Sequence, residues 1–296
     1  MRLLVCGDLH LKPAGSGYDL DAVTVPESVD AAVVLGDLTH RAGKDDRELA
    51  RRVVERLAKS VPVLYVPGNH DHAPMPHRVV EGIDDAESCH RTVRSFDDLT
   101  VVGWGCEQRS LPLSIDQREF AALDVSTEPR GERRYAANRT ADAIEAACGD
   151  VIRGDTSRED AAAELGITRE ERPTFETTLE RISSTYEDLS SLLSGEENVL
   201  LASHVPPFNT AFDRHHAIGS REDDLASVHV GSVAIKLVTA EHDTFAALSG
   251  HSHSHGYEVG DDGRPHYLNL GFRGIATVDV APDRGLFSFT RIAGEE

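Results

Sequence analysis

The 296-residue sequence is poor in cysteine and contains no long apolar run. Its cysteines, Cys6, Cys89, Cys106 and Cys148, lie far apart and form no Cys-x-x-Cys pair, which argues against a zinc knuckle and against a secreted disulfide framework. The N-terminus reaches Asp8 before a signal-peptide core could form, and no segment is long enough to span a bilayer. These absences predict a soluble cytoplasmic protein without a membrane partner.

Basic and aromatic residues are also scarce. The chain has 51 Asp and Glu residues against 30 Lys and Arg residues, a net charge of −21, and its aromatic content is 5%. An acidic, lysine-poor surface is typical of proteins that work in molar salt, where screening suppresses self-repulsion, so we expect a halophilic protein. The same surface argues against a nucleic-acid partner, and composition gives no indication of the oligomeric state.

Several apolar runs predict buried strands. They cover residues 2–6, 31–35, 61–66, 198–202 and 245–248. The first three are joined by crossovers, one of them a predicted helix over residues 45–59, which indicates a parallel sheet with a site at the carboxyl ends of its strands. Four shorter alternating segments between residues 257 and 292 predict a mostly antiparallel closing sheet.

Residues 106–195 differ in amino-acid composition and pattern from the rest of the chain. They contain many acids and alanines and few β-branched runs, and helical spacing is clear over residues 157–165 and 174–193. We interpret this stretch as a mostly helical insertion or cap within a single domain that spans residues 1–296.

Polar side chains follow each of the five apolar runs. These residues are Asp8 and His10, Asp37, Asn69 and His70, His204, and His251 and His253. One histidine after a strand is usually structural, but five such ends in one sheet are hard to explain by packing and predict a metal site. Without His70 these are seven oxygen and nitrogen donors, none of them cysteine, and they suit two divalent ions better than one tetrahedral zinc. Asp37 is the natural bridge, because a carboxylate can bind two ions.

These motifs resemble, in order, those of the calcineurin-like metallophosphoesterases. They are Asp8-x-His10, Gly36-Asp37, Gly68-Asn69-His70-Asp71, His204 and Gly250-His251-x-His253. A closer likeness is to archaeal phosphoesterases of unassigned substrate, through Gly36-Asp37-Leu38-Thr39-His40, His204-Val205-Pro206-Pro207, His229-Val230-Gly231-Ser232 and Gly250-His251-Ser252-His253.

The resemblance implies a four-layer α/β/β/α sandwich with a binuclear centre. Asp8, His10 and His253 would hold one ion. Asn69, His204 and His251 would hold the other, and Asp37 would bridge them. Catalysis would involve His70 near the leaving group, steadied by Asp71. We expect manganese, with iron, zinc, cobalt and nickel as alternatives.

The predicted activity is hydrolysis of a small phosphate mono- or diester by a metal-bridging hydroxide. His70 would donate a proton to the leaving oxygen. Two alternatives stay open: a nuclease of the same superfamily, and a non-catalytic metal-binding scaffold for protein interactions. Complete ligands argue against the scaffold, and the acidic surface argues against the nuclease.

Overall fold

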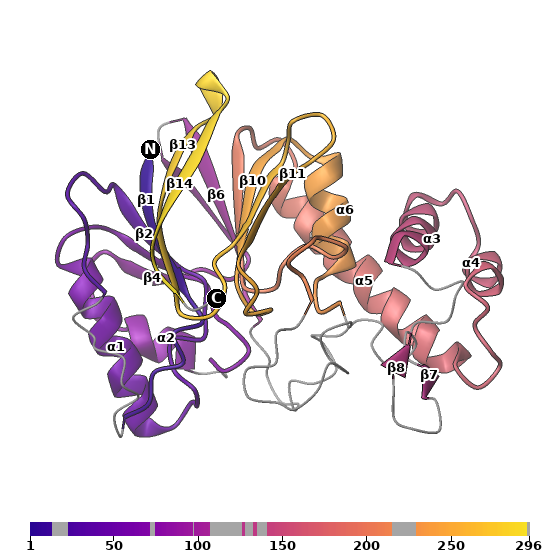
Figure 1. Cartoon of the computed structure of the whole chain (residues 1–296), viewed down its shortest axis with the longest axis horizontal. Helices are drawn as coiled ribbons and strands as arrows, with labels where there is room; N and C mark the ends of the chain where they lie inside the picture. The colour runs from indigo at the N-terminus through magenta and orange to yellow at the C-terminus, as the bar shows by residue number, and fades with distance from the viewer. Residues whose placement is uncertain are drawn as a thin grey trace.

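The computed structural model describes residues 1–13, 23–71, 75–96, 98–106, 126–127, 133–134, 141–214 and 229–294. Within these ranges the strands form two six-stranded sheets and one two-stranded sheet. The large sheets face each other, and helices cover their outer faces (Figure 1). The predicted four-layer α/β/β/α architecture is therefore confirmed.

The first sheet has the order β14-β13-β1-β2-β3-β4. Its strands are β1 (Arg2–Gly7), β2 (Ala31–Val34), β3 (Val63–Tyr65), β4 (Ala86–Ser88), β13 (Gly274–Ala281) and β14 (Leu286–Ala293). β1 to β4 are parallel, β13 pairs with β1 in the antiparallel direction, and β14 pairs with β13 in the antiparallel direction. The 3-10 helix η2 (Pro282–Arg284) links the last two. Helices α1 (Lys44–Ala58) and α2 (Met75–Val80) cover the outer face.

The second sheet has the order β11-β12-β10-β9-β6-β5. Its strands are β5 (Thr92–Phe96), β6 (Leu99–Trp104), β9 (Val199–Ser203), β10 (Thr244–Ser249), β11 (Gly256–Val259) and β12 (His266–Asn269). Helices α5 (Arg172–Leu193) and α6 (Val233–Glu241) lie outside it in Figure 1. The side chain of Ser232 caps α6 by accepting a hydrogen bond from the Ile235 amide.

The main core lies between the two sheets. Leu3, Val5 and Val33 of the first sheet pack against Leu200 and Leu248 of the second, and all five are fully buried. The predicted single closing sheet is wrong, because β11 and β12 extend the second sheet whereas β13 and β14 extend the first. Alternation of apolar and polar residues predicts which face of a strand is buried but not its partner strand.

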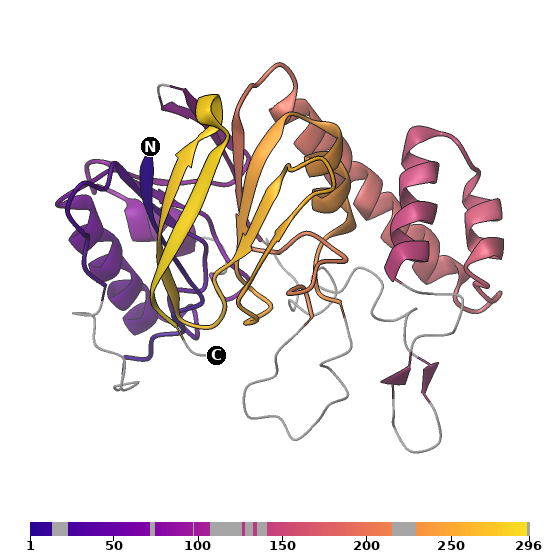
Figure 2. The ribbon, with the colours of Figure 1, turned by 45° about the horizontal axis from the view of Figure 1, so that its top comes forward.

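Helix α5 packs against different parts of the chain at its two ends. Leu189 and Leu193, near the end of α5, pack with Leu201 of β9 and so belong to the outer layer of the sandwich. Phe175 and Leu179, nearer its start, pack instead with α3 (Ala141–Arg153) and α4 (Arg158–Glu164). In Figure 2 α3 and α4 lie beyond α5, away from both large sheets.

The insertion over residues 106–195 stays a prediction, and residues 107–125, 128–132 and 135–140 lie outside the described residues. The two-stranded sheet pairs β7 (Ser126–Thr127) with β8 (Arg133–Arg134). No helix in the described ranges has the length and apolar character needed to cross a bilayer.

Candidate metal centre

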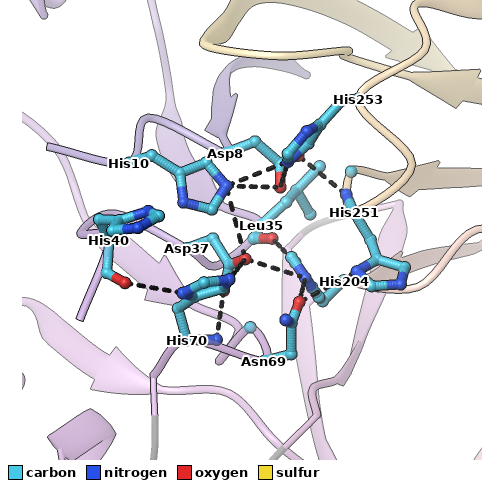
Figure 3. Close-up of polar contacts among 12 residues, drawn as sticks. Asp8, His10, Leu35, Asp37, His40, Asn69, His70, His204, His251 and His253 are labelled. Carbon is cyan, nitrogen blue, oxygen red and sulfur yellow. Dashed lines mark hydrogen bonds and ion pairs between the residues drawn. The ribbon is translucent and has the colours of Figure 1, made fainter. Parts of the chain in front are cut away.

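The strand-end donors come together in one cluster of side chains, as Figure 3 shows. Asp8 and His10 follow β1, Asp37 follows β2, Asn69 and His70 follow β3, His204 follows β9, and His251 and His253 follow β10. These strands belong to both sheets, so the expectation of one shared sheet is wrong. The donors still meet, because the carboxyl ends of the parallel strands in the two sheets lie at the same edge.

The backbone at these strand ends adopts an unusual conformation. Asp8, His10 and Asp37 have φ values of 51°, 44° and 53°, and His251 and His253 have 67° and 61°. Left-handed φ values are uncommon for residues with a Cβ and gather at functional sites, where they cost about 1–3 kcal/mol each. Five such residues in one cluster indicate that side-chain placement there outweighs backbone preference.

Two glycines allow the carboxylates to lie against the backbone. A Cβ added at Gly68 would lie 2.2 Å from Asp37 Oδ1, and one added at Gly250 would lie 2.2 Å from Asp8 Oδ2. Contacts below about 3 Å are essentially absent for real Cβ atoms. Glycine is therefore required at both positions if the two carboxylates are to keep their places.

A first group of donors consists of Asp8, His10 and His253. Asp8 Oδ1 lies 3.9 Å from His10 Nε2 and 3.7 Å from His253 Nε2. The two imidazole Nε2 atoms are 3.1 Å apart. Three atoms of the types that bind divalent transition metals thus converge from two sheets.

A second group consists of Asn69, His204 and His251. Asn69 Oδ1 lies 2.8 Å from His204 Nε2 and 3.0 Å from His251 Nδ1. His204 Nδ1 lies 2.7 Å from the Leu35 carbonyl oxygen, which can only accept, so Nδ1 carries the proton. That hydrogen bond leaves Nε2, which faces Asn69 Oδ1, as the nitrogen that would bind a metal, as in many metal-binding histidines.

Asp37 lies between the two groups. Its Oδ2 is 3.7 Å from His10 Nε2 in the first group and 3.6 Å from His204 Nε2 in the second. Its Oδ1 instead accepts a hydrogen bond of 2.8 Å from the His70 amide. One carboxylate oxygen is therefore fixed by the backbone, and the other faces both groups at similar distances.

The electrostatics of the cluster fit divalent cations. Burial raises the pKa of Asp8 to about 7, and the nearby charge of Asp37 adds to the rise. Burial would also raise the pKa of Asp37, but His204, His10 and His70 outweigh it and hold that pKa below its usual value. Asp8 Oδ1 is buried without a hydrogen-bond donor among the described residues. A buried carboxylate oxygen in this position is suited to binding a cation.

His10 is already in the protonation state that coordinates metals. Burial lowers the pKa of His10 to about 4. Asp37 acts in the opposite direction and raises this pKa, whereas the nearby histidines lower it further. Neutral imidazole binds a metal ion, whereas imidazolium cannot. The donor set of carboxylate, amide oxygen and imidazole, with no thiolate, therefore fits two divalent ions.

Asp71 is placed differently from the prediction that it steadies His70. His70 Nδ1 donates a hydrogen bond of 2.8 Å to the carbonyl oxygen of His40, and the two imidazole rings stack with centroids 5.4 Å apart. Asp71 Oδ2 accepts hydrogen bonds from the amides of Asp37 at 2.8 Å and Gly68 at 2.9 Å. The predicted pairing of Asp71 with the His70 ring is wrong. Asp71 fixes the backbone next to Asp37, and His40 orients His70.

The roles of His40 and Phe272 were missed at the sequence level. His40 acts on His70 through its backbone carbonyl, which every residue has, so no side-chain signal exists. Phe272 has its ring centroid 5.6 Å from that of His10 and 4.9 Å from that of His253. Phe272 follows β12, and the sequence did not predict the sheet to which β12 belongs. His215 and His216, which the sequence indicates are loop residues, lie outside the described residues.

Comparisons with known proteins identify a family and similar solved structures. A family model described as calcineurin-like phosphoesterase matches residues 1–255. No curated protein sequence matches the chain. The solved structure of phosphopantetheinyl hydrolase from Mycobacterium tuberculosis is similar with a TM-score of 0.50 and 18% identity, over 92% of this chain and 89% of that chain. A dimetal phosphatase from Danio rerio has a TM-score of 0.45 and 14% identity, over 94% and 91%.

Proposed function

The chain belongs to the calcineurin-like phosphoesterase family, and from that premise we propose that it hydrolyses small phosphate mono- or diesters with two ions held by its seven strand-end donors. Metal-dependent phosphoester hydrolysis is the activity of the family. The observation that supports the two-ion assignment most strongly is the position of Asp37 Oδ2, 3.7 Å from His10 Nε2 and 3.6 Å from His204 Nε2. An oxygen facing two groups of donors suits a bridging ligand.

The ligands divide between the ions by proximity. Asp8, His10 and His253 would hold the first ion. Asn69, His204 and His251 would hold the second, with Asp37 shared. We propose manganese as the native metal, although this mixed oxygen and imidazole set also accepts iron, zinc, cobalt and nickel, so availability contributes to the choice.

The reaction needs a nucleophile, charge stabilisation and a proton for the leaving group. When bound, the two ions would supply a water of lowered pKa as the nucleophile and would offset the charge that develops on the phosphoryl oxygens. The chain itself supplies the proton donor. Because the His70 Nδ1 proton is committed to the His40 carbonyl, Nε2 faces the centre, 4.0 Å from Asp37 Oδ2.

His70 is also accessible to a substrate. Its side chain is 30% exposed, whereas that of Asp37 is 2% exposed. In its protonated form it can donate a proton from Nε2 to the leaving oxygen. A general acid of this kind typically contributes about 10² to 10⁴-fold to the rate.

The test is a metal-by-substrate panel on metal-stripped protein in high KCl. Manganese, iron, zinc, cobalt and nickel are each combined with an aryl phosphate monoester, an aryl diester, nucleotides and DNA. We expect Asp37→Asn to lose metal binding and activity, and His70→Gln to keep metal but turn over slowly. His77→Gln on α2 is the matched control and should behave as wild type.

Each other outcome contradicts a stated part of the proposal. Unchanged turnover in His70→Gln removes His70 from the reaction. DNA cleaved faster than any aryl ester favours the nuclease. Metal-replete protein that hydrolyses none of the substrates favours the interaction scaffold.

A further inference from the structure

Residues 270–273 carry the chain from β12 in the second sheet to β13 in the first, directly beside the candidate metal centre. Two consecutive amides of this crossover bind the loops that carry the first group of donors. The Phe272 amide donates to the His253 carbonyl oxygen at 3.3 Å, and the Arg273 amide donates to the Asp8 carbonyl oxygen at 3.0 Å. The crossover therefore joins one donor loop from each sheet.

The Phe272 ring lies against both histidines of the first group. It stacks on the His10 ring with an interplanar angle of 28° and a centroid distance of 5.6 Å, and contacts the His253 ring at 4.9 Å and 52°. These two imidazoles come from different sheets. His10 and His253 also contact each other, with ring centroids 5.0 Å apart, as do His204 and His251 of the second group at 5.1 Å, but only the first pair has an aromatic ring against both members among the described residues.

The crossover is firmly anchored by Asn269. This fully buried side chain has Nδ2 2.6 Å from the Gly250 carbonyl oxygen and 3.2 Å from Ser252 Oγ, both in the loop of His251 and His253. Its Oδ1 accepts a hydrogen bond of 2.9 Å from the Gly271 amide. The backbone beside Phe272 is thus held in register with the loop that the ring contacts.

Phe272 has no comparable role in the core. Among the described residues it belongs to none of the four apolar clusters that stabilise the sandwich. Its neighbours are the two histidines and Arg273, whose Cζ lies 5.0 Å from the ring centroid. Aromatic contacts of this kind restrict the orientation of the rings they touch.

We propose that Phe272 is a positioning residue that holds His10 and His253 at ligand spacing and so sets the affinity of the first ion alone. The ring does this by bracing two imidazoles that no shared strand connects. The inference rests on the proposed two-ion centre. Residues that orient metal-binding side chains typically contribute about 10 to 100-fold to metal affinity.

The test compares Phe272→Leu with a matched control. Leucine keeps an apolar side chain but removes the flat ring. Phe245→Leu is the control, because the Phe245 ring has the same kinds of neighbours, the His266 ring at 5.1 Å and Arg264 Cζ at 5.4 Å, at a place without a proposed ligand. Metal-stripped proteins are titrated with cobalt, and both the stepwise affinities and the visible absorption spectrum are recorded.

We expect Phe272→Leu to weaken one of two binding steps by about tenfold or more and to leave the other unchanged. The cobalt spectrum of the weakened site should change, and Phe272→Tyr, which keeps the ring, should restore both. Phe245→Leu should lower the melting temperature without changing either affinity. His253→Ala and His251→Ala identify the two steps, and the step lost in His253→Ala should be the one that Phe272→Leu weakens.

The failures are distinguishable. If wild type binds two ions and Phe272→Leu changes neither step, or both equally, the inference is overturned and the proposed centre stands. If wild type binds fewer than two ions, or neither histidine variant loses a step, the two-ion proposal itself fails, and the inference with it.

Discussion

Asp71→Ala should destabilise the protein strongly, and Asp71→Asn mildly. Asp71 is fully buried, and its Oδ2 accepts hydrogen bonds from the amides of Asp37 and Gly68 at 2.8 and 2.9 Å. Alanine leaves two buried donors without a partner, at about 1–3 kcal/mol each, so the free energy of unfolding should fall by about 2–6 kcal/mol. Asparagine keeps an oxygen for both amides. Because burial and the nearby Asp37 raise the pKa of Asp71 to about 6, loss of its charge removes no favourable electrostatic energy, so the free energy of unfolding should fall by only about 1 kcal/mol or less.

The same substitutions should weaken metal binding, because Asp71 fixes the backbone of Asp37. A ligand displaced by about 1 Å can cost about 10²-fold in rate. The free energy of unfolding is measured by urea denaturation of the metal-free protein in high KCl. The value of kcat is measured with a series of aryl phosphates whose leaving groups differ in pKa. Since Asp71 does not contact the His70 ring, Asp71→Asn should slow all leaving groups alike, and its effect should add to that of His70→Gln.

Two results would refute this reasoning. One is an Asp71→Ala variant as stable as wild type, because its two amides would then need no partner. The other is an Asp71→Asn variant that is slow only with poor leaving groups and adds nothing to His70→Gln. That pattern would return Asp71 to the role of steadying His70.

Three further results are expected. Gly250→Ala should lower metal affinity and activity, because the added Cβ would lie 2.2 Å from Asp8 Oδ2 and overpacking costs about 1–3 kcal/mol. The control Gly154→Ala should lower only the melting temperature, because Gly154 has a φ of +80° but open space around it. EDTA should lower the melting temperature of wild type but not of Asp37→Asn, because each ion at about a hundredfold its Kd adds about 2.7 kcal/mol. The net charge of −21 predicts that KCl raises the melting temperature, and a flat or falling response in scanning calorimetry would contradict the halophilic interpretation.

The strands that carry the donors could be predicted because each is an apolar run followed directly by polar residues. β1, β2 and β3 lie within or close to the predicted runs, and α1 differs by one residue at each end from the predicted helix. β4 has only partly buried residues and left no such signal. The sheet to which β11 to β14 belong depends on where residues 270–273 cross, and residue pattern alone does not specify that crossing.

The candidate site shows the same limit more sharply. Donor side chains at strand ends are visible in a sequence, because their types match metal chemistry. Two features are not: the hydrogen bond from His70 to the His40 carbonyl, which uses a backbone group, and the turn of the Asp71 carboxylate toward two amides. An Asp next to a His in sequence suggests a pair, but adjacent side chains need not point the same way.

In the proposed centre each ion would bind donors from both sheets. Asp8 and His10 belong to the first sheet and His253 to the second, while Asn69 belongs to the first and His204 to the second. Metal binding therefore offsets two unfavourable features at once: buried carboxylates in a chain of net charge −21, and backbone strain at Asp8 and His10. Since the fully buried core between the sheets needs no ion to form, the metals would stabilise the carboxyl edge of the sandwich rather than the fold as a whole.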